Sequence, residues 1–318
     1  MTEPLHARWR NRLADNPTAL AFIGLLALCI AMAFVSDRFF TWDNLSNVAR
    51  QVSINAIIAI GMTIVILTGG IDLSVGSVMA LSMTFCAGAM LAGLPVPVAM
   101  LAGLATGVVF GAVNGLLIAH ARLPAIIVTL ATMEIPRGIA LLFTGGYPQS
   151  GLPSSFAFVG RGEVFGVQMP ILIMLAVFVA AFVLLKYFPA GRYFQALGGN
   201  EEATRLSGVR VERHKFLAYT LSGLTAAISG IVLSSRLMSG QPNAGTGFEL
   251  DAIAAVVLGG TAITGGRGSI VGTLIGALTL GVLNNGLNLM SVSPYTQKVL
   301  KGVIILLAIY AGSFKRNR

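Results

Sequence analysis

Ionisable residues inside the apolar stretches of the sequence are the first candidates for chemistry, and they are few. Glu134 and Arg137 lie three residues apart, so one face of a helix would carry both and they could form an ion pair. Such a pair could be structural or could belong to a proton or ion pathway. Asp72 follows the helix-breaking pair Gly69-Gly70. We expect its carboxylate to cap the following helix or to line a pathway.

Other reactive residue types do not gather into a recognisable site. His6, His120 and His214 are scattered and lack the spacing of metal ligands. No nucleophile, base and orienting group form a catalytic constellation. We therefore expect no metal site and no enzymatic activity in this chain.

The polar stretch 188–215 contains a short helix signal. Asn200 is a natural N-cap, Glu201 and Glu202 suit the positive end of a helix, and Gly208 can adopt the left-handed conformation after its last turn. These residues predict a helix of about two turns. A helix that short is marginal alone in water, which favours a docking partner over an ordinary solvated loop.

The composition indicates that lipid surrounds the elements that carry these residues. Of 318 residues, 55% are hydrophobic and 10% are charged, and the mean hydropathy is +0.83. A soluble domain carries about 25% charged residues. We predict an all-α polytopic membrane protein with about ten transmembrane helices, the first of them uncleaved. The expected spans are 18–35, 53–67, 74–93, 96–119, 124–145, 169–187, 216–236, 251–264, 269–290 and 296–313.

The distribution of the basic residues predicts the orientation. The 21 Lys and Arg residues outnumber the 12 Asp and Glu residues and cluster before the first span, in 188–215 and at the C-terminus. This is the positive-inside pattern and not a nucleic-acid surface, so both termini are expected in the cytoplasm. The domain boundaries follow: a cytoplasmic tail at 1–17, a transmembrane domain at 18–313 and a second tail at 314–318. Periplasmic loops are expected at 36–52, 146–168 and 237–250.

An internal repeat relates 55–77 to 251–273, and both copies contain Thr-Gly-Gly followed by Val-Gly. In the span count above, the two copies run in the same sense. Glycine breaks at matching positions of two halves often mark the pathway of a transporter. The alternative is a pair of ordinary tight turns at the membrane surface. The candidate pathway residues are Gly69, Gly70, Asp72, Gly265, Gly266, Asn55 and Asp251.

Stripes of glycine at every fourth position allow close helix packing in lipid, within one subunit or between two. They comprise Gly103, Gly107, Gly111 and Gly115, and later Gly268, Gly272 and Gly276. Neutral hydrogen-bonding side chains in the spans favour an uncharged, hydroxyl-rich solute over an ion, although each could equally bond a neighbouring helix. They are Asn114, Asn284, Asn285, Asn288, Thr129 and Thr132.

Four motifs make the chain resemble the ribose-type permeases of bacterial ABC importers, in the branched-chain amino acid/ribose permease superfamily. They are GMTIVILTGGIDLSVGS (61–77), GRYFQALGGNEEATRLSGV (191–209), QPNAGTG followed by ELDAIAAVVLGGT after Phe248 (241–261), and GSIVGTLIGALTLGVLNNGLNL (268–289). Within the second motif, Glu202-Ala203-Thr204 with Gly208 resembles the coupling motif of these permeases, with Thr204 in place of alanine. The residues expected to couple to an ATPase are Asn200, Glu201, Glu202, Ala203, Thr204, Arg205 and Gly208.

This resemblance implies a type II-like ABC importer permease in the inner membrane that translocates a monosaccharide by alternating access. It also implies a second permease copy, a cytoplasmic ABC ATPase subunit and a periplasmic sugar-binding protein. The sequence has no G-x-x-x-x-G-K-[ST] motif, so ATP and Mg²⁺ would be bound by the ATPase and no cofactor is expected here. The alternative is an ion-coupled secondary transporter of a small neutral solute.

Overall fold

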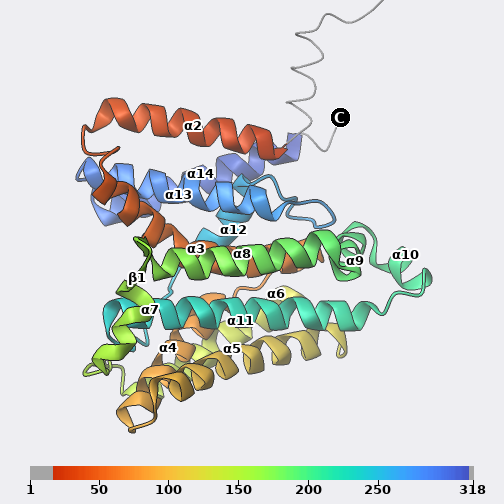
Figure 1. Ribbon diagram of the computed structural model, residues 1–318. Coiled ribbons are helices and arrows are strands. Elements are labelled where there is room, and N and C mark those ends of the chain that lie inside the picture. Colours follow the sequence, from red (N-terminus) through yellow and green to blue (C-terminus); the bar gives the residue numbers. More distant parts are fainter. Residues whose placement is uncertain (1–16, 315–318) are drawn as a thin grey trace, which may run out of the picture.

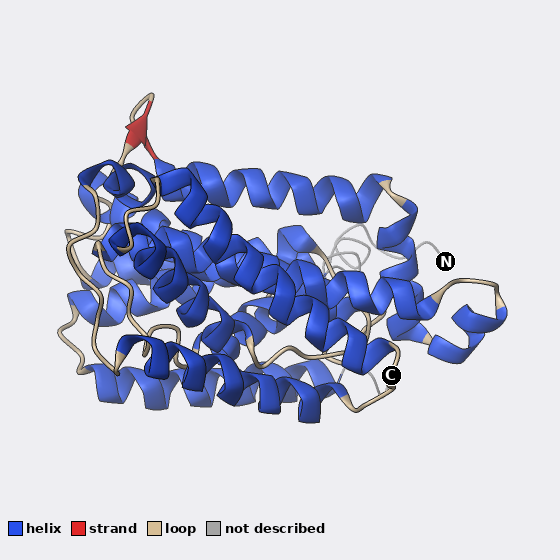
Figure 2. Cartoon of the chain, turned by 90° about the horizontal axis from the view of Figure 1, so that it is seen from below, coloured by secondary structure: helices blue, strands red, loops and turns tan. Residues whose placement is uncertain are grey.

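The computed structural model describes residues 17–314, and most of them are helical (Figures 1 and 2). Each of the ten expected spans corresponds to one helix, which confirms the all-α polytopic fold. The tails lie outside the described residues except for Pro17 and Phe314. The ten helices are α2 (Pro17–Val35), α3 (Trp42–Leu67), α4 (Val75–Leu91), α5 (Val96–Ala119), α6 (Ala125–Thr144), α8 (Met169–Tyr187), α11 (Val211–Leu237), α12 (Phe248–Leu258), α13 (Ile270–Leu289) and α14 (Pro294–Phe314).

One of these helices is far shorter than a bilayer requires. Among the described residues, 7 helices are long and apolar enough to cross a membrane, and α4 is a shorter apolar helix. Helix α12 has 11 residues, which span about 16 Å at 1.5 Å per residue, against about 30 Å for the hydrocarbon core. The expected span at 251–264 is therefore a half-helix followed by an irregular segment.

Short elements lie at the two ends of the bundle. At one end, η1 (Ser154–Phe156) and α7 (Ala157–Arg161) precede a hairpin of β1 (Glu163–Val164) and β2 (Val167–Gln168), paired antiparallel with Glu163 opposite Gln168. We call this the hairpin end. At the opposite end, which we call the α10 end, lie α9 (Pro189–Gly199) and α10 (Glu201–Leu206) (Figure 1).

The loops expected on one side of the membrane do meet. Gln149 and Gly240 exchange two backbone hydrogen bonds, of 2.8 and 2.9 Å. These bonds join the connection that follows α6 to the one that follows α11. The bundle therefore has two distinct ends, as the predicted topology requires.

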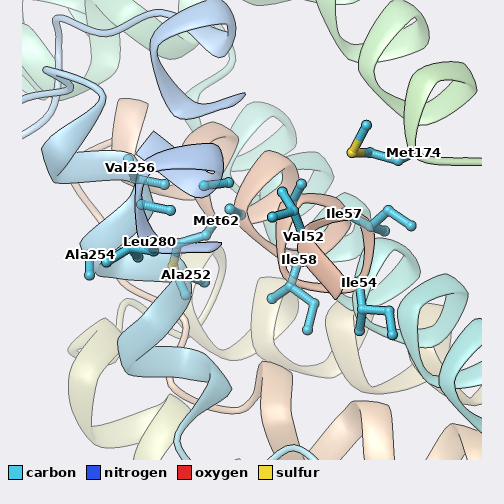
Figure 3. Packing of buried hydrophobic residues seen from close by; sticks show 14 of the residues in the cluster. Val52, Ile54, Ile57, Ile58, Met62, Met174, Ala252, Ala254, Val256 and Leu280 are labelled. Atoms are coloured by element: carbon cyan, nitrogen blue, oxygen red, sulfur yellow. The ribbon is translucent and has the colours of Figure 1, made fainter. Parts of the chain in front are cut away.

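Helix α3 is the centre of the bundle. It packs against α8, α9, α11, α12 and α13, and most of its residues from 52 to 67 are buried. Figure 3 shows Met62 of α3 on the side of Ala252 of α12 and Leu280 of α13, and Ile57 on the side of Met174 of α8. A helix that is apolar around its whole circumference is buried by its neighbours, whereas the outer helices leave apolar side chains for lipid.

The glycine stripes pack helices within the chain. A Cβ atom at Gly111 of α5 would lie 2.5 Å from the Tyr219 carbonyl oxygen, and one at Gly115 would lie 2.8 Å from the Phe216 carbonyl oxygen, both on α11. In the second stripe, a Cβ atom at Gly276 of α13 would overlap the Ala255 carbonyl oxygen of α12. The backbones of these helices are therefore in contact. These positions form packing surfaces within one subunit, not between two.

Candidate transport and coupling site

Helix α10 has the geometry that the sequence predicted. The Asn200 side-chain oxygen accepts a hydrogen bond of 2.9 Å from the Ala203 backbone N–H, which satisfies one free donor of the first turn. The helix ends at Leu206, and Gly208 adopts a φ of 82° in the left-handed region. Figures 1 and 2 show this helix projecting from the bundle. Leu206 is 80% exposed at its end.

Ion pairs fasten α10 to the first turns of α11. Glu201 contacts Arg205 at 3.1 Å and Lys215 at 2.5 Å, and Arg205 contacts Glu212 at 3.6 Å. Thr204 is buried and its hydroxyl donates to the Asn200 carbonyl oxygen. The solvent-exposed face of α10 therefore consists of Glu202, Ala203 and Leu206.

The two repeat copies meet at a junction of glycines that also includes the end of α9. The Gly266 backbone N–H donates to the Leu67 carbonyl oxygen at 3.1 Å. A Cβ atom at Gly265 would lie 2.7 Å from the Gly69 nitrogen and 2.9 Å from the Gly198 Cα. A Cβ atom at Gly198 would overlap both the Leu67 oxygen and the Gly266 nitrogen. We call these five residues the glycine junction.

The glycine junction is close to α10 in the sequence, because Gly198 lies only two residues before Asn200, the N-cap of α10. Sequence analysis placed Gly69 and Gly265 at matching positions but did not include Gly198. The Gly-Gly pair at 198–199 was the only signal for it in the sequence. The junction therefore joins three segments that are far apart in the sequence.

A cavity of about 440 Å³ lies beside the glycine junction at the α10 end. Its walls include Gly69 and Gly198 of the junction, Glu201 of α10 and Tyr219 of α11. The Tyr219 hydroxyl is buried, lies against Gly70 and has no hydrogen-bond partner within the described part of the chain. This cavity therefore separates part of α10 and the base of α11 from the break that follows α3.

Asp72 holds the break between α3 and α4 in place. Its carboxylate accepts hydrogen bonds from the Ser74 backbone N–H at 3.0 Å, the Ser74 hydroxyl at 2.6 Å and the Ser222 hydroxyl at 2.8 Å. The Asn114 amide donates to the Ser74 hydroxyl at 2.9 Å. The carboxylate satisfies groups at the start of α4, as a cap would, and it is buried. In this conformation Asp72 does not line an open pathway.

The remaining candidate pathway residues lie away from the glycine junction. Asn55 precedes Leu67 by 12 residues on α3, which corresponds to about 18 Å along the helix axis. Its side-chain oxygen is buried without a partner among the described residues. Asp251 forms an ion pair of 3.0 Å with Lys301 of α14. The structure therefore does not bring these two residues to the glycine breaks.

The expected pair of Glu134 and Arg137 does not form. Arg137 instead donates two hydrogen bonds to backbone carbonyl oxygens, at 2.6 Å to Pro242 and at 2.7 Å to Ala244. Glu134 is exposed and makes no ion pair within residues 17–314.

The hydrogen bonds of Arg137 also show that the segment 237–250, expected as a periplasmic loop, lies partly inside the bundle. Arg137 lies in the interior of α6, so the segment that bonds it enters the bundle. A Cβ atom at Gly76, at the start of α4, would contact the carboxylate of Glu249 at 2.6 Å. The first turn of α12 therefore lies inside the bundle. The Gly and Pro residues of QPNAGTG were the available signal for an irregular segment in this position.

Comparisons with known proteins agree with this architecture. The family described as "Branched-chain amino acid transport system / permease component" matches residues 44–309. The ribose import permease protein of Escherichia coli is 50% identical over 302 residues, covering 93% of this chain and 94% of that protein. The ribose import permease protein of Bacillus subtilis is 49% identical over 91% of this chain and 90% of its own length.

Relatives named after other sugars are also similar. The L-arabinose transport system permease protein of Escherichia coli is 40% identical, covering 91% of this chain and 88% of that protein. The similarity extends over nearly the whole chain and includes the junction and α10, so it concerns the complete permease architecture. The chain therefore belongs to the family of ABC importer permease components, as a multi-pass membrane subunit whose ATPase is a separate protein.

Proposed function

We propose that this chain is the membrane-spanning subunit of an ATP-driven importer for a monosaccharide of the ribose type. The observation that carries the proposal is the geometry of α10, a capped helix that projects from the bundle and is only two residues from the glycine junction. Such a helix can transmit a movement from an external partner to both repeat copies. The sugars after which the relatives are named, ribose and L-arabinose, are both pentoses and supply the class of solute.

The proposal assigns a partner to each end of the bundle. A cytoplasmic ABC ATPase contacts the face of α10 that carries Glu202, Ala203 and Leu206. A periplasmic sugar-binding protein docks at the hairpin end, and a second permease copy completes the transporter within the inner membrane. Both termini lie in the cytoplasm, and ATP binding and hydrolysis drive alternating access.

The glycine junction provides the route of coupling. Movement of α9 and α10 displaces Gly198, whose Cα is in direct contact with the backbones of both repeat copies. Because this contact is made by backbone atoms, it is stiff and leaves little space for independent motion. The ends of α3 and of the segment after α12 must then shift together.

Adjacent glycines offer a matched test of this route. A methyl group at Gly198 would overlap backbone atoms, whereas one at Gly199 has nothing within 4 Å. We expect Gly198→Ala to lower the number of sugar molecules imported per ATP hydrolysed by roughly tenfold, within the usual range of coupling between sites. Gly199→Ala should retain the wild-type ratio. Equal ratios in the two variants would exclude the glycine junction as the coupling route.

The function itself is tested with the complete transporter in proteoliposomes, comprising this permease, its ATPase and its binding protein. We expect uptake of labelled ribose to require ATP inside the vesicle and the binding protein outside it. Xylose, L-arabinose and leucine are offered in the same assay to define the substrate class. Uptake of leucine without uptake of any sugar would show that the substrate is an amino acid and not a sugar. Uptake driven by an ion gradient without ATP would support a secondary transporter.

A further inference from the structure

A charged side chain lies on the outside of the bundle, on one of its membrane-spanning helices. Glu134 occupies the middle of α6 (Ala125–Thr144), a helix long and apolar enough to span the membrane. Its side chain is exposed, and no ion pair neutralises it within residues 17–314. A carboxylate facing hydrocarbon at this depth is costly, and ionisable residues in spans face protein or water. Glu134 itself is therefore expected to face protein or water, whereas its neighbours Leu130 and Ile135 are exposed apolar side chains.

Polar groups gather around this position from another part of the chain. Arg137, less than one turn along α6, binds the carbonyl oxygens of Pro242 and Ala244. Both belong to the irregular segment that leads into α12, and Thr246 in that segment is exposed. Irregular backbone at membrane depth occurs only where it is buried in protein or lines a water-filled cavity.

The first turn of half-helix α12 lies in the same region. It begins after Gly247, and its free backbone N–H groups carry the positive end of the helix dipole. Glu249 in this turn accepts a hydrogen bond of 3.2 Å from the Gly247 N–H and interacts electrostatically with Arg137. Half-helix ends near the midplane, with charged groups beside them, are typical of transporter substrate sites.

On the basis of the sugar import proposed above, we infer that Glu134 lines the sugar translocation path and accepts hydrogen bonds from the hydroxyl groups of the sugar. Arg137 positions the irregular segment opposite Glu134 and so sets the width of the path. Glu134 interacts electrostatically with Arg137 but forms no ion pair with it among the described residues, so its carboxylate oxygens stay free to accept hydrogen bonds. Charge-assisted hydrogen bonds are stronger than neutral ones. Neither residue is part of the glycine junction, so this site is distinct from the coupling route.

Water access to Glu134 can be tested independently of sugar transport. The cysteine variant Glu134→Cys is assembled with the ATPase and binding protein and treated with a small, charged, membrane-impermeant thiol reagent. We expect labelling whose rate changes when sugar-loaded binding protein or ATP is added. Val179→Cys is the matched control, because Val179 lies near the middle of α8, is 54% exposed and faces lipid in our interpretation. The wild-type chain gives the background from Cys29 and Cys86.

Two labelling results would overturn the inference. No labelling of Glu134→Cys in any state would place this face against the second permease copy or against lipid. Equal labelling of Val179→Cys would show that the reagent reaches the outer surface of the bundle through lipid or detergent.

Contact with the sugar requires a transport measurement. We expect Glu134→Ala to lower the uptake rate of ribose by roughly tenfold, since a hydrogen bond to a charged group contributes at least this factor. The ratio of uptake rates for ribose and a deoxy analogue should also change, whereas a purely structural defect would lower both rates equally. An unchanged ratio of the two uptake rates would show that Glu134 does not contact the sugar. If the wild-type transporter imports no sugar, the proposed function fails, and labelling still decides whether Glu134 faces water.

Discussion

At the scale of single residues, the hydrogen bonds of Asp72 determine how the first break in the bundle is held. Its carboxylate satisfies donors from Ser74 and Ser222, which belong to segments far apart in the sequence. Replacing it by alanine leaves these buried donors without an acceptor. We expect Asp72→Ala to lower the free energy of unfolding by about 2–5 kcal/mol. Denaturation of the purified protein in detergent measures this change.

An exposed aspartate provides the control for that measurement. Asp37 lies in the connection after α2, where its side chain is exposed. Asp37→Ala should shift the unfolding transition by no more than about 0.5 kcal/mol, as is usual for surface substitutions. Similar shifts for the two variants would mean that the Asp72 network does not stabilise the break.

At the scale of elements, α10 depends on backbone geometry at its last turn. Gly208 has a φ of 82°, and no atom lies within 4 Å of a Cβ atom built on it. Gly208→Val therefore creates backbone strain without a clash, at a cost of about 1–2 kcal/mol. We expect this variant to insert and to bind the ATPase more weakly, with reduced sugar-stimulated ATP hydrolysis. Co-purification and ATPase assays of the reconstituted transporter measure both effects.

The matched substitution at the same position is Gly208→Asn. Asparagine tolerates the left-handed conformation better than a β-branched residue. It should retain most of the stimulation that valine removes. If both variants behave like the wild-type protein, the end of α10 does not need this conformation for coupling.

At the scale of the whole molecule, the two ends of the bundle should face opposite sides of the membrane. Ser207 lies at the end of α10, and Ser150 lies beside the bridge between Gln149 and Gly240. Both serines are exposed. We expect a cysteine at Ser207 to react with an impermeant thiol reagent only from the cytoplasm, and one at Ser150 only from the periplasm. The reversed pattern in intact cells and inverted vesicles would reject the proposed orientation.

The sequence by itself determined the features that depend on neighbouring residues. Apolar stretches between 18 and 313 located the ten helices, because lipid leaves a backbone no other way to satisfy its hydrogen bonds. Asn200 and Gly208 bounded α10, because a cap and a left-handed glycine act within one helical turn. The repeat also identified Gly69 and Gly265 as equivalent positions, without showing what they contact.

Tertiary structure alone decided which distant segments meet. Gly198 contacts Leu67 and Gly266 although none of them is near another in the sequence. Arg137 was expected to pair with Glu134. It instead donates hydrogen bonds to two carbonyl oxygens more than 100 residues away in the sequence. The half-length of α12 was also decided by the fold, because the helix begins at Phe248 and ends at Leu258 before the irregular segment that carries Gly265 and Gly266. Local spacing predicts which groups could interact, whereas packing between helices selects the partners that remain when water and lipid are excluded.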